Sequence, residues 1–344
     1  MGNSDIKCAP VMITTLSRKS YLERALVSLS KNSYAEFTDL FISVDYPPSE
    51  KYEEGYKQVC EFLKGFDFSA FKSADVTYQR ENLGGTRNAF FLENKVKKVS
   101  DKVIVSEEDN EFAPCFLEYM NKMLDKYQND ERVIAICGAS TGEKFDIGSE
   151  YIFSKAFSPY GIGLWESKMD LLRTKGQDYV LNPKNWSSKK MKVFKRKSRI
   201  FSGKYICDVL CKDYGLFWMD NNSLAWVDSM FTIFMYMTNR VCVIPRIAKS
   251  RTWGNDGTGH SGMKQITFPD LDVRDFFRID DKIGITVDKE NYKSVEDFLI
   301  AMEIPEKRTQ TFVSYGLLKV LGREKTIRLL KKVRIIAKGT KEVV

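Results

Sequence analysis

The sequence lacks most of the features that would place a protein outside the cell or across a membrane. Its seven cysteines are odd in number and include no CxxC pair, so neither a disulfide framework nor a zinc ribbon is predicted. The amino terminus, MGNSDIKCAP, has no apolar signal-peptide core, and its Ile6 stands where myristoylation requires Ser or Thr. No window approaches the roughly 18 uncharged apolar residues of a membrane span. We therefore expect a cytoplasmic protein that is soluble or peripheral on the inner face of the membrane.

The composition predicts a folded protein with anionic partners. Of the 344 residues, 43% are hydrophobic and 13% aromatic, which is enough for an ordinary packed core. The sequence contains no internal repeat and no low-complexity tract. A net charge of +8 favours phosphates, phospholipids or nucleic acid as partners, without choosing among them.

Short apolar strands alternate with amphipathic helices through the first 140 residues. Strict alternation predicts an α/β fold with a mainly parallel, doubly wound sheet, because right-handed crossovers place helices on both faces. We expect strands at Ala9–Thr15, Asp39–Asp45, Val76–Gln79, Val103–Glu107 and Val133–Cys137, and helices at Tyr21–Leu29, Tyr52–Leu63, Leu83–Val99 and Phe116–Tyr127.

The pattern after Gly138 is mixed and rich in aromatic residues. There we expect a strand at Tyr151–Phe157, helices at Ile162–Leu172 and Leu224–Thr238, a strand at Arg240–Pro245 and a glycine-rich loop at Lys249–Gly262. The basic segment Lys184–Lys204 reads as a surface loop, with polyanion binding as the alternative. The basic amphipathic helical region Phe312–Lys338 is expected to dock on the main domain, or to lie on an anionic membrane surface.

An acidic turn is the most informative feature of the chain. In VIVSEEDNEFAP the apolar run stops at Glu107, Glu108 and Asp109, at the carboxyl end of an expected buried strand. Ligands bind at that edge of open α/β sheets, and clustered carboxylates repel one another unless a divalent cation neutralises them. The turn therefore predicts a metal-assisted nucleotide site. The alternative is a solvated turn in which Asn110 and Glu111 cap the next helix.

Further polar residues follow the other strands and would share this edge of the sheet. Glycines at 84 and 85 allow close backbone approach before a helix whose amino terminus favours anions. The cations, amides and acid expected to form this rim are Arg18, Asp45, Arg80, Asn82, Arg87 and Asn88.

Two single residues later in the chain are candidates for chemistry. Asp228 lies in the apolar segment AWVDSMFTIFMYM, where burying an acid is costly unless it is paired or useful. It is a candidate general base, with a solvent-facing or capping acid as the alternative. The only histidine, His260, lies in SRTWGNDGTGHSG among four glycines. It would contact metal or diphosphate, or be an ordinary surface histidine.

Several of these segments together resemble one group of enzymes. ALVSLSKN, RENLGGTRNAFF and EEDN resemble the nucleotide half of metal-dependent glycosyltransferases of the A-type fold, family 2-like. VIVSEEDNEFAPCFLEYM is most similar to the EDD segment of the N-acetylglucosaminyltransferase I family. The resemblance covers roughly residues 9 to 262 through scattered motifs.

The resemblance implies roles for individual residues. Asp109 takes the position of the direct metal ligand, with Glu108 near the ribose or a metal-bound water and His260 as a further metal contact. Asp228 takes the position of the catalytic base, although Val227 replaces the acid before it. The nucleotide sugar would contact Thr15, Arg18, Asp45, Arg80, Asn82, Arg87, Glu107 and Glu108, and the segment FSPYGIGLWES would place Gly161, Gly163 and Trp165 on the acceptor side.

The resemblance also implies an activity. Residues 1–262 would form the catalytic domain, with a nucleotide half at 1–140 and an acceptor half at 141–262, followed by a carboxyl-terminal extension at 263–344. The enzyme would use Mn²⁺ or Mg²⁺ and transfer a hexosyl or N-acetylhexosaminyl group, with inversion, from a nucleotide-diphosphate sugar, preferably a UDP-sugar. The acceptor would be a glycan or lipid-linked glycan in surface polysaccharide synthesis, and nucleic acid is not an expected partner.

Other functions remain as alternatives at this stage. A sugar nucleotidyltransferase would favour a glycine-rich loop after the first strand, and LSRKSYLERAL has no glycine. A non-enzymatic module that binds polyanions through Lys184–Lys204 would give binding that falls steeply with salt and survives EDTA. A glycosidase is disfavoured because those enzymes use two separated acids and no metal cluster.

Overall fold

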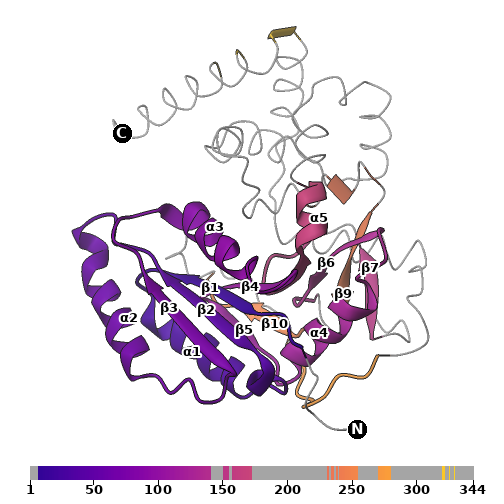
Figure 1. Ribbon diagram of the computed structural model, residues 1–344, viewed down its shortest axis with the longest axis horizontal. Helices are drawn as coiled ribbons and strands as arrows, with labels where there is room; N and C mark the ends of the chain where they lie inside the picture. Colours follow the sequence, from indigo (N-terminus) through magenta and orange to yellow (C-terminus); the bar gives the residue numbers. More distant parts are fainter. Residues whose placement is uncertain are drawn as a thin grey trace, which may run out of the picture. The chain divides into compact units, whose positions relative to one another are not determined.

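The computed structural model describes residues 7–140, 150–154, 157–172, 240–254 and 270–279, with single residues at 231, 234, 235, 238, 320, 321, 325 and 329 (Figure 1). The chain divides into two compact units. One comprises Met1–Met169 and Arg240–Glu296, and the other comprises Asp170–Asn239 and Asp297–Val344. The first unit contains almost all of the described residues, including the whole of the sheet.

Eight strands of the described residues form one sheet, in the order β3-β2-β1-β4-β8-β6-β9-β7. The strands are β1 (Val11–Thr15), β2 (Asp39–Val44), β3 (Ser73–Tyr78), β4 (Lys102–Glu107), β6 (Val133–Cys137), β7 (Tyr151–Ser154), β8 (Ile162–Trp165) and β9 (Val241–Pro245). The first four in spatial order are parallel, so their carboxyl ends meet at one edge. β8 runs antiparallel between β4 and β6, and β7 runs antiparallel to β9.

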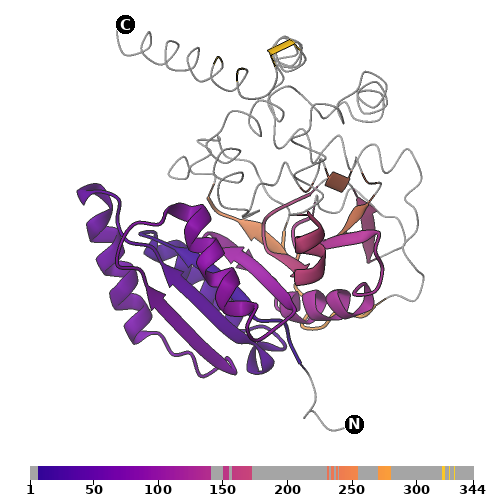
Figure 2. The ribbon, with the colours of Figure 1, turned by 45° about the horizontal axis from the view of Figure 1, so that its top comes forward.

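Helices cover both faces of the sheet. The helices are α1 (Lys19–Ser30), α2 (Glu53–Gly65), α3 (Gly84–Val96), α4 (Phe116–Lys126) and α5 (Glu166–Leu171), with the 3-10 turns η2 (Ala35–Phe37) and η3 (Glu50–Tyr52). Figures 1 and 2 show α3 against one face of the parallel strands and α1 and α2 along the other, while α4 packs against β8 and β6. A two-stranded antiparallel ribbon of β5 (Asn110–Phe112) and β10 (Ser250–Thr252) packs beside α1.

The parallel strands hold the core because they are apolar on both faces. In β1, Val11, Met12 and Ile13 have at most 1% of their surface exposed, as expected for a strand covered by helices on both sides. Leu22, Leu26 and Leu29, all fully buried, recur at helical spacing along the inner face of α1. Each such side chain stabilises the fold by about 1.5–3 kcal/mol relative to an exposed one.

The predicted α/β architecture with a mainly parallel sheet is confirmed. The five strands and four helices expected within residues 7–140 occur in the expected order, with shifted ends: β3 begins at Ser73 rather than Val76, and α3 ends at Val96 rather than Val99. Two expectations are wrong. Ile162–Leu172 is not one helix, and Lys249–Gly262 is not loop throughout, since Ser250–Thr252 is strand β10.

The first error has a simple physical cause. Ile162–Trp165 forms a strand buried between β4 and β6, and only Glu166–Leu171 is helical. A short apolar run that is buried on all sides shows no periodicity that separates strand from helix.

Other expectations fall largely outside the described residues. Phe231, Phe234, Met235 and Thr238 are helical, as are Val320, Leu321, Lys325 and Leu329, while the remainder of Leu224–Thr238 and Phe312–Lys338 and all of Lys184–Lys204 lie outside. Among the described residues, no helix is sufficiently long and apolar to cross a membrane.

Candidate functional site

The acidic turn lies where β4 ends, next to the carboxyl end of β1. β4 pairs with β1 in parallel, and β5 begins immediately after the turn at Asn110. The three acids differ in their surroundings: Glu107 is exposed, whereas Glu108 and Asp109 are 9% and 7% exposed. The two buried carboxylates therefore require compensation by hydrogen bonds or by positive charge.

Arg18 supplies that compensation from the loop between β1 and α1. Its Nε donates to Glu108 Oε1 at 2.7 Å, and its Nη2 donates to Asp109 Oδ2 at 2.8 Å. The guanidinium lies 5.1 Å from the ring centroid of Tyr21, which further fixes its plane. The structure thus brings together three residues that the sequence predicted for one site.

The charges in this cluster influence one another strongly. Burial raises the pKa of Glu108, the attraction of Arg18 lowers it, and repulsion by Asp109 raises it again, so that the pKa lies above its ordinary value. Burial alone would lower the pKa of Arg18, but the two carboxylates outweigh this effect and raise it. Because one cation faces two buried acids, the cluster attracts additional positive charge.

β10 closes over Asp109 from a distant part of the sequence. Thr252 Oγ1 donates to Asp109 Oδ1 at 3.3 Å, and the Trp253 backbone N–H donates to the Asp109 carbonyl at 2.8 Å. A Cβ atom on Gly254 would lie 2.1 Å from Asp109 Oδ2, so any side chain there would displace the Asp109 carboxylate or the chain after β10. Thr252 and Gly254 are site residues that the sequence analysis did not single out, although Gly254 lies within the predicted glycine-rich loop.

Two buried donor atoms beside the acids lack a hydrogen-bond partner in the described part of the chain. They are Thr15 Oγ1, at the carboxyl end of β1, and Arg18 Nη1. Thr15 is only 4% exposed. Buried donors without partners are rare in native proteins, and they are expected where a ligand supplies the missing acceptors.

Asp45, which follows β2, binds the start of α3. Its carboxylate accepts hydrogen bonds from the backbone N–H groups of Leu83 and Gly84, each at 2.8 Å, and of Tyr46 at 2.9 Å. Asn82 Nδ2 adds a longer bond at 3.3 Å. Burial raises the pKa of Asp45 above its ordinary value, although these backbone bonds act in the opposite direction. Asp45 therefore holds α3 against the site edge of the sheet.

The remaining predicted residues have different surroundings. Arg80 and Arg87 are exposed. Trp165 is 2% exposed and donates its Nε1–H to the Leu124 carbonyl at 3.1 Å, so core packing accounts for it. Gly163 leaves room for Leu124, and Gly161 has a φ of +69°, which favours glycine. Asp228 and His260 lie outside the described residues.

Whether the site can hold a divalent metal ion depends on the oxygen ligands that the two buried acids, Glu108 and Asp109, can offer. In the part of the chain that the structure describes, no three His, Cys, Asp or Glu side chains lie close enough together to hold an ion. Glu108 and Asp109 offer hard carboxylate oxygens, and Mg²⁺ is commonly held by one or two carboxylates with water and substrate phosphates completing its shell. The donors therefore fit a metal that a phosphate-bearing ligand shares.

Comparisons with known proteins give a coarse likeness in structure. No protein-family model matches the chain, and no curated protein matches its sequence. Mannosyltransferase PcManGT from Pyrobaculum calidifontis, solved with GDP-Man and Mn²⁺, is 11% identical over 49% of this chain and 47% of its own, with a TM-score of 0.34. S. aureus TarS 1-349, solved with UDP, is 12% identical over 71% of this chain and 60% of its own, with a TM-score of 0.38.

A third structure, S. aureus TarS 1-349 with UDP-GlcNAc, is 14% identical over 46% of this chain and 45% of its own, with a TM-score of 0.31. The chain thus spans less than two thirds of each of these proteins. Likenesses at such TM-scores do not identify an activity, so the residues themselves must carry the functional argument.

Proposed function

We propose that this protein is a glycosyltransferase that binds a nucleotide-diphosphate sugar, preferably a UDP-sugar, over the carboxyl ends of β1 and β4. The observation that carries the proposal is the Arg18–Glu108–Asp109 cluster beside two donors, Thr15 Oγ1 and Arg18 Nη1, that lack partners among the described residues. A nucleoside diphosphate carries many acceptor oxygens, which match these donors. Ligands of open α/β sheets bind at this edge.

A divalent ion, Mn²⁺ or Mg²⁺, would be held by Asp109 and Glu108, where it would neutralise the charge that develops on the leaving diphosphate. Thr252 donates a hydrogen bond to the Asp109 carboxylate, and Gly254 leaves room for that carboxylate. The exposed Glu107, Arg80 and Arg87 and the amide of Asn82 are proposed as outer contacts to the donor.

The transfer step needs an acceptor hydroxyl and a base. We assign the base to Asp228, because an acid in an otherwise apolar segment is costly unless it is useful. A single base and one displacement would invert the anomeric configuration. The hydroxyl oxygen forms the new bond to the anomeric carbon, the bond to the diphosphate breaks, and Asp228 receives the hydroxyl proton.

The acceptor side of the proposal comes from the sequence. The acceptor would be a glycan or lipid-linked glycan, with Gly161 and Gly163 shaping that side and the buried Trp165 supporting β8 from the core. His260 would contact metal or diphosphate. The net charge of +8 suits work at an anionic membrane surface on surface polysaccharide.

The test is a panel of UDP- and GDP-sugars with Mn²⁺, in which release of nucleoside diphosphate is measured. We expect hydrolysis of at least one donor, its loss with EDTA, and its loss in Asp109→Asn. Glu61→Gln is the matched control, since Glu61 is an exposed acid on α2. Absence of any donor binding or hydrolysis would overturn the proposal, and release of inorganic diphosphate would indicate a nucleotidyltransferase instead.

A further inference from the structure

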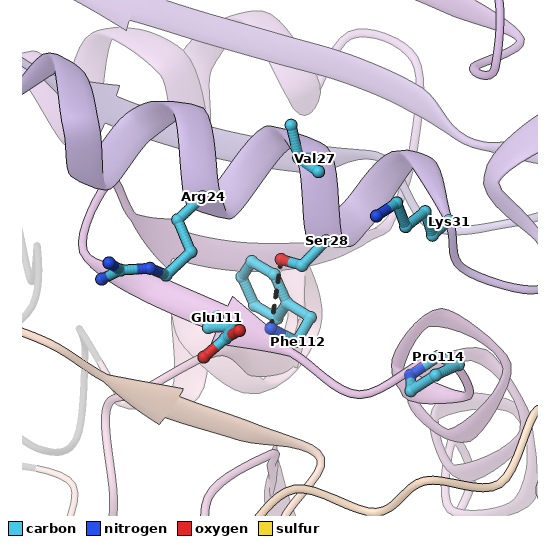
Figure 3. Close-up of a pocket in the computed structure, with 7 residues that line it drawn as sticks. All are labelled: Arg24, Val27, Ser28, Lys31, Glu111, Phe112 and Pro114. Atoms are coloured by element: carbon cyan, nitrogen blue, oxygen red, sulfur yellow. Dashed lines mark hydrogen bonds between the residues drawn. The ribbon is translucent and has the colours of Figure 1, made fainter.

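A surface pocket of about 230 Å³ lies between α1 and β5 (Figure 3). Val27 and Phe112 give it an apolar lining, and Arg24 of α1 and Lys31, which caps that helix, lie on either side of Ser28. Arg24 lies on α1 and Lys31 is the residue that follows its last turn; they are seven residues apart, about two helical turns, so both lie on the side of the helix that lines the pocket.

Both cations are available to a ligand. Among the described residues, neither Arg24 nor Lys31 forms an ion pair with an acid. The only acid lining the pocket, Glu111, already accepts from Arg251 Nε at 2.8 Å and from Trp253 Nε1 at 2.8 Å. The charge of Glu111 is therefore balanced outside the pocket, and the pocket keeps an excess of positive charge.

The guanidinium of Arg24 is held in place before any ligand binds. Its Cζ lies 4.2 Å from the ring centroid of Trp253, and Arg251 Cζ lies 4.9 Å from the same ring. The indole also donates to Glu111, so α1, β5 and β10 are linked through one side chain. A cation fixed by stacking loses little conformational entropy when it binds an anion.

We propose that this pocket binds a phosphate group, through the guanidinium fork of Arg24 and the ammonium of Lys31, with the apolar lining receiving the carbon atoms that carry the phosphate. Arginine matches phosphate geometry with two parallel hydrogen bonds, and lysine adds a point charge. The binding itself does not depend on a sugar donor. The further step, that the phosphate belongs to the acceptor, rests on the proposed function.

Trp253 provides a direct probe of binding. The chain has five tryptophans, so a full-length protein labelled with ¹⁵N at the indoles gives five indole signals, of which Trp253→Phe identifies one. Inorganic phosphate and glycerol 3-phosphate are titrated at constant ionic strength, with chloride as the reference. We expect the Trp253 signal to shift to saturation while the signal of buried Trp165 does not move.

Variants separate binding from general charge effects. Lys31→Gln should weaken the apparent affinity about tenfold, as expected for loss of one charge-assisted hydrogen bond. Arg24→Gln should abolish saturation, and Arg24→Lys should restore part of it. Lys57→Gln, an exposed lysine on α2, is the matched control and should behave like the wild type.

The source of the phosphate is distinguished with vesicles. A shift with phosphatidylglycerol vesicles but not with phosphatidylcholine, in the absence of soluble phosphate, would assign the phosphate to a lipid headgroup. A shift with glycerol 3-phosphate alone would assign it to a soluble or glycan-borne group. A Trp253 signal that does not move with either vesicles or glycerol 3-phosphate would overturn the proposal. So would a signal that moves in Lys31→Gln and Arg24→Gln as it does in the wild type. Both outcomes count whether or not a nucleotide sugar is hydrolysed.

Discussion

Arg18 and Asp109 are 91 residues apart in the sequence, yet Arg18 Nη2 lies 2.8 Å from Asp109 Oδ2. The contact exists because β1 and β4 are parallel neighbours, so the residues that follow them meet at one edge of the sheet. The same guanidinium binds Glu108 at 2.7 Å. Removing Arg18 would therefore leave two buried acids without a counter-charge.

Arg18→Ala should destabilise the fold by about 3 kcal/mol, because it leaves Glu108 and Asp109 buried without a counter-charge. Urea unfolding followed by circular dichroism measures the change. Combining Arg18→Ala with Glu108→Gln should recover part of the loss, since one unpaired charge is then removed. Arg132→Ala, which removes an ion pair with Asp130 whose arginine side chain is 75% exposed, is the control and should change stability by less than about 1 kcal/mol.

Gly254→Ala should impair the site with little effect on the fold. The added methyl group would lie 2.1 Å from Asp109 Oδ2, so either Asp109 or the chain after β10 must move. We expect the affinity for Mn²⁺, measured by isothermal titration calorimetry in the presence of UDP, to fall at least tenfold. Gly65→Ala is the matched control, since no atom lies within 4 Å of its Cβ position. Equal affinities in the two variants would contradict the assigned role of Gly254.

Much of this fold could be predicted because the parallel strands and their helices carry strong local patterns. β1, β2, β4 and β6 are short apolar runs followed by turns, and α1 and α4 have apolar faces at helical spacing. The position of Arg18 beside Glu108 and Asp109 follows from the same alternation, because parallel strands bring their carboxyl ends together. The sequence thus indicated which edge of the sheet carries the site.

The remainder of the site depends on contacts that leave no local signal. β10 has only three residues, and its partner β5 lies about 140 residues earlier, so nothing in SRTWG shows that Thr252 reaches Asp109. The burial of Trp165 also left no local signal in the sequence. The resemblance of FSPYGIGLWES placed Trp165 on the acceptor side, whereas the tertiary structure buries it and its indole N–H donates to the Leu124 carbonyl.

Asp45→Ala should weaken the attachment of α3 to the sheet. The variant leaves the backbone N–H groups of Leu83 and Gly84 without their acceptor, which for a helix amino terminus costs about 1 kcal/mol. Amide hydrogen exchange should therefore accelerate in the first turn of α3, while exchange in α1 is unchanged. Asp67→Ala, an exposed acid that accepts from the Ser69 backbone, is the control and should leave exchange in α3 unaltered.

The buried pair Lys249–Asp272 makes the stability of the first unit sensitive to acid. Lys249 and Asp272 have side chains that are 0% and 1% exposed, and Arg274 also donates to Asp272. Burial alone would raise the pKa of Asp272, but the hydrogen bonds from Arg274 and Lys249 outweigh it and hold the pKa at about 2, below its ordinary value of 3.8. A depressed pKa means that the stabilisation is complete above about pH 4 and is lost as the pH falls toward 2.

Between pH 5 and pH 2 the free energy of unfolding should therefore fall by about 2 kcal/mol more in the wild type than in Asp272→Asn, which cannot titrate at this position. Urea unfolding at a series of pH values gives the free energy of unfolding against pH for both proteins. The slopes of the two curves are compared, because Asp272→Asn is expected to be less stable than the wild type at every pH above 4. Asp125→Asn, whose acid pairs with Lys102 and is 65% exposed, should keep the slope of the wild type. Parallel curves for the wild type and Asp272→Asn would mean that Asp272 is not held ionised by Lys249 and Arg274.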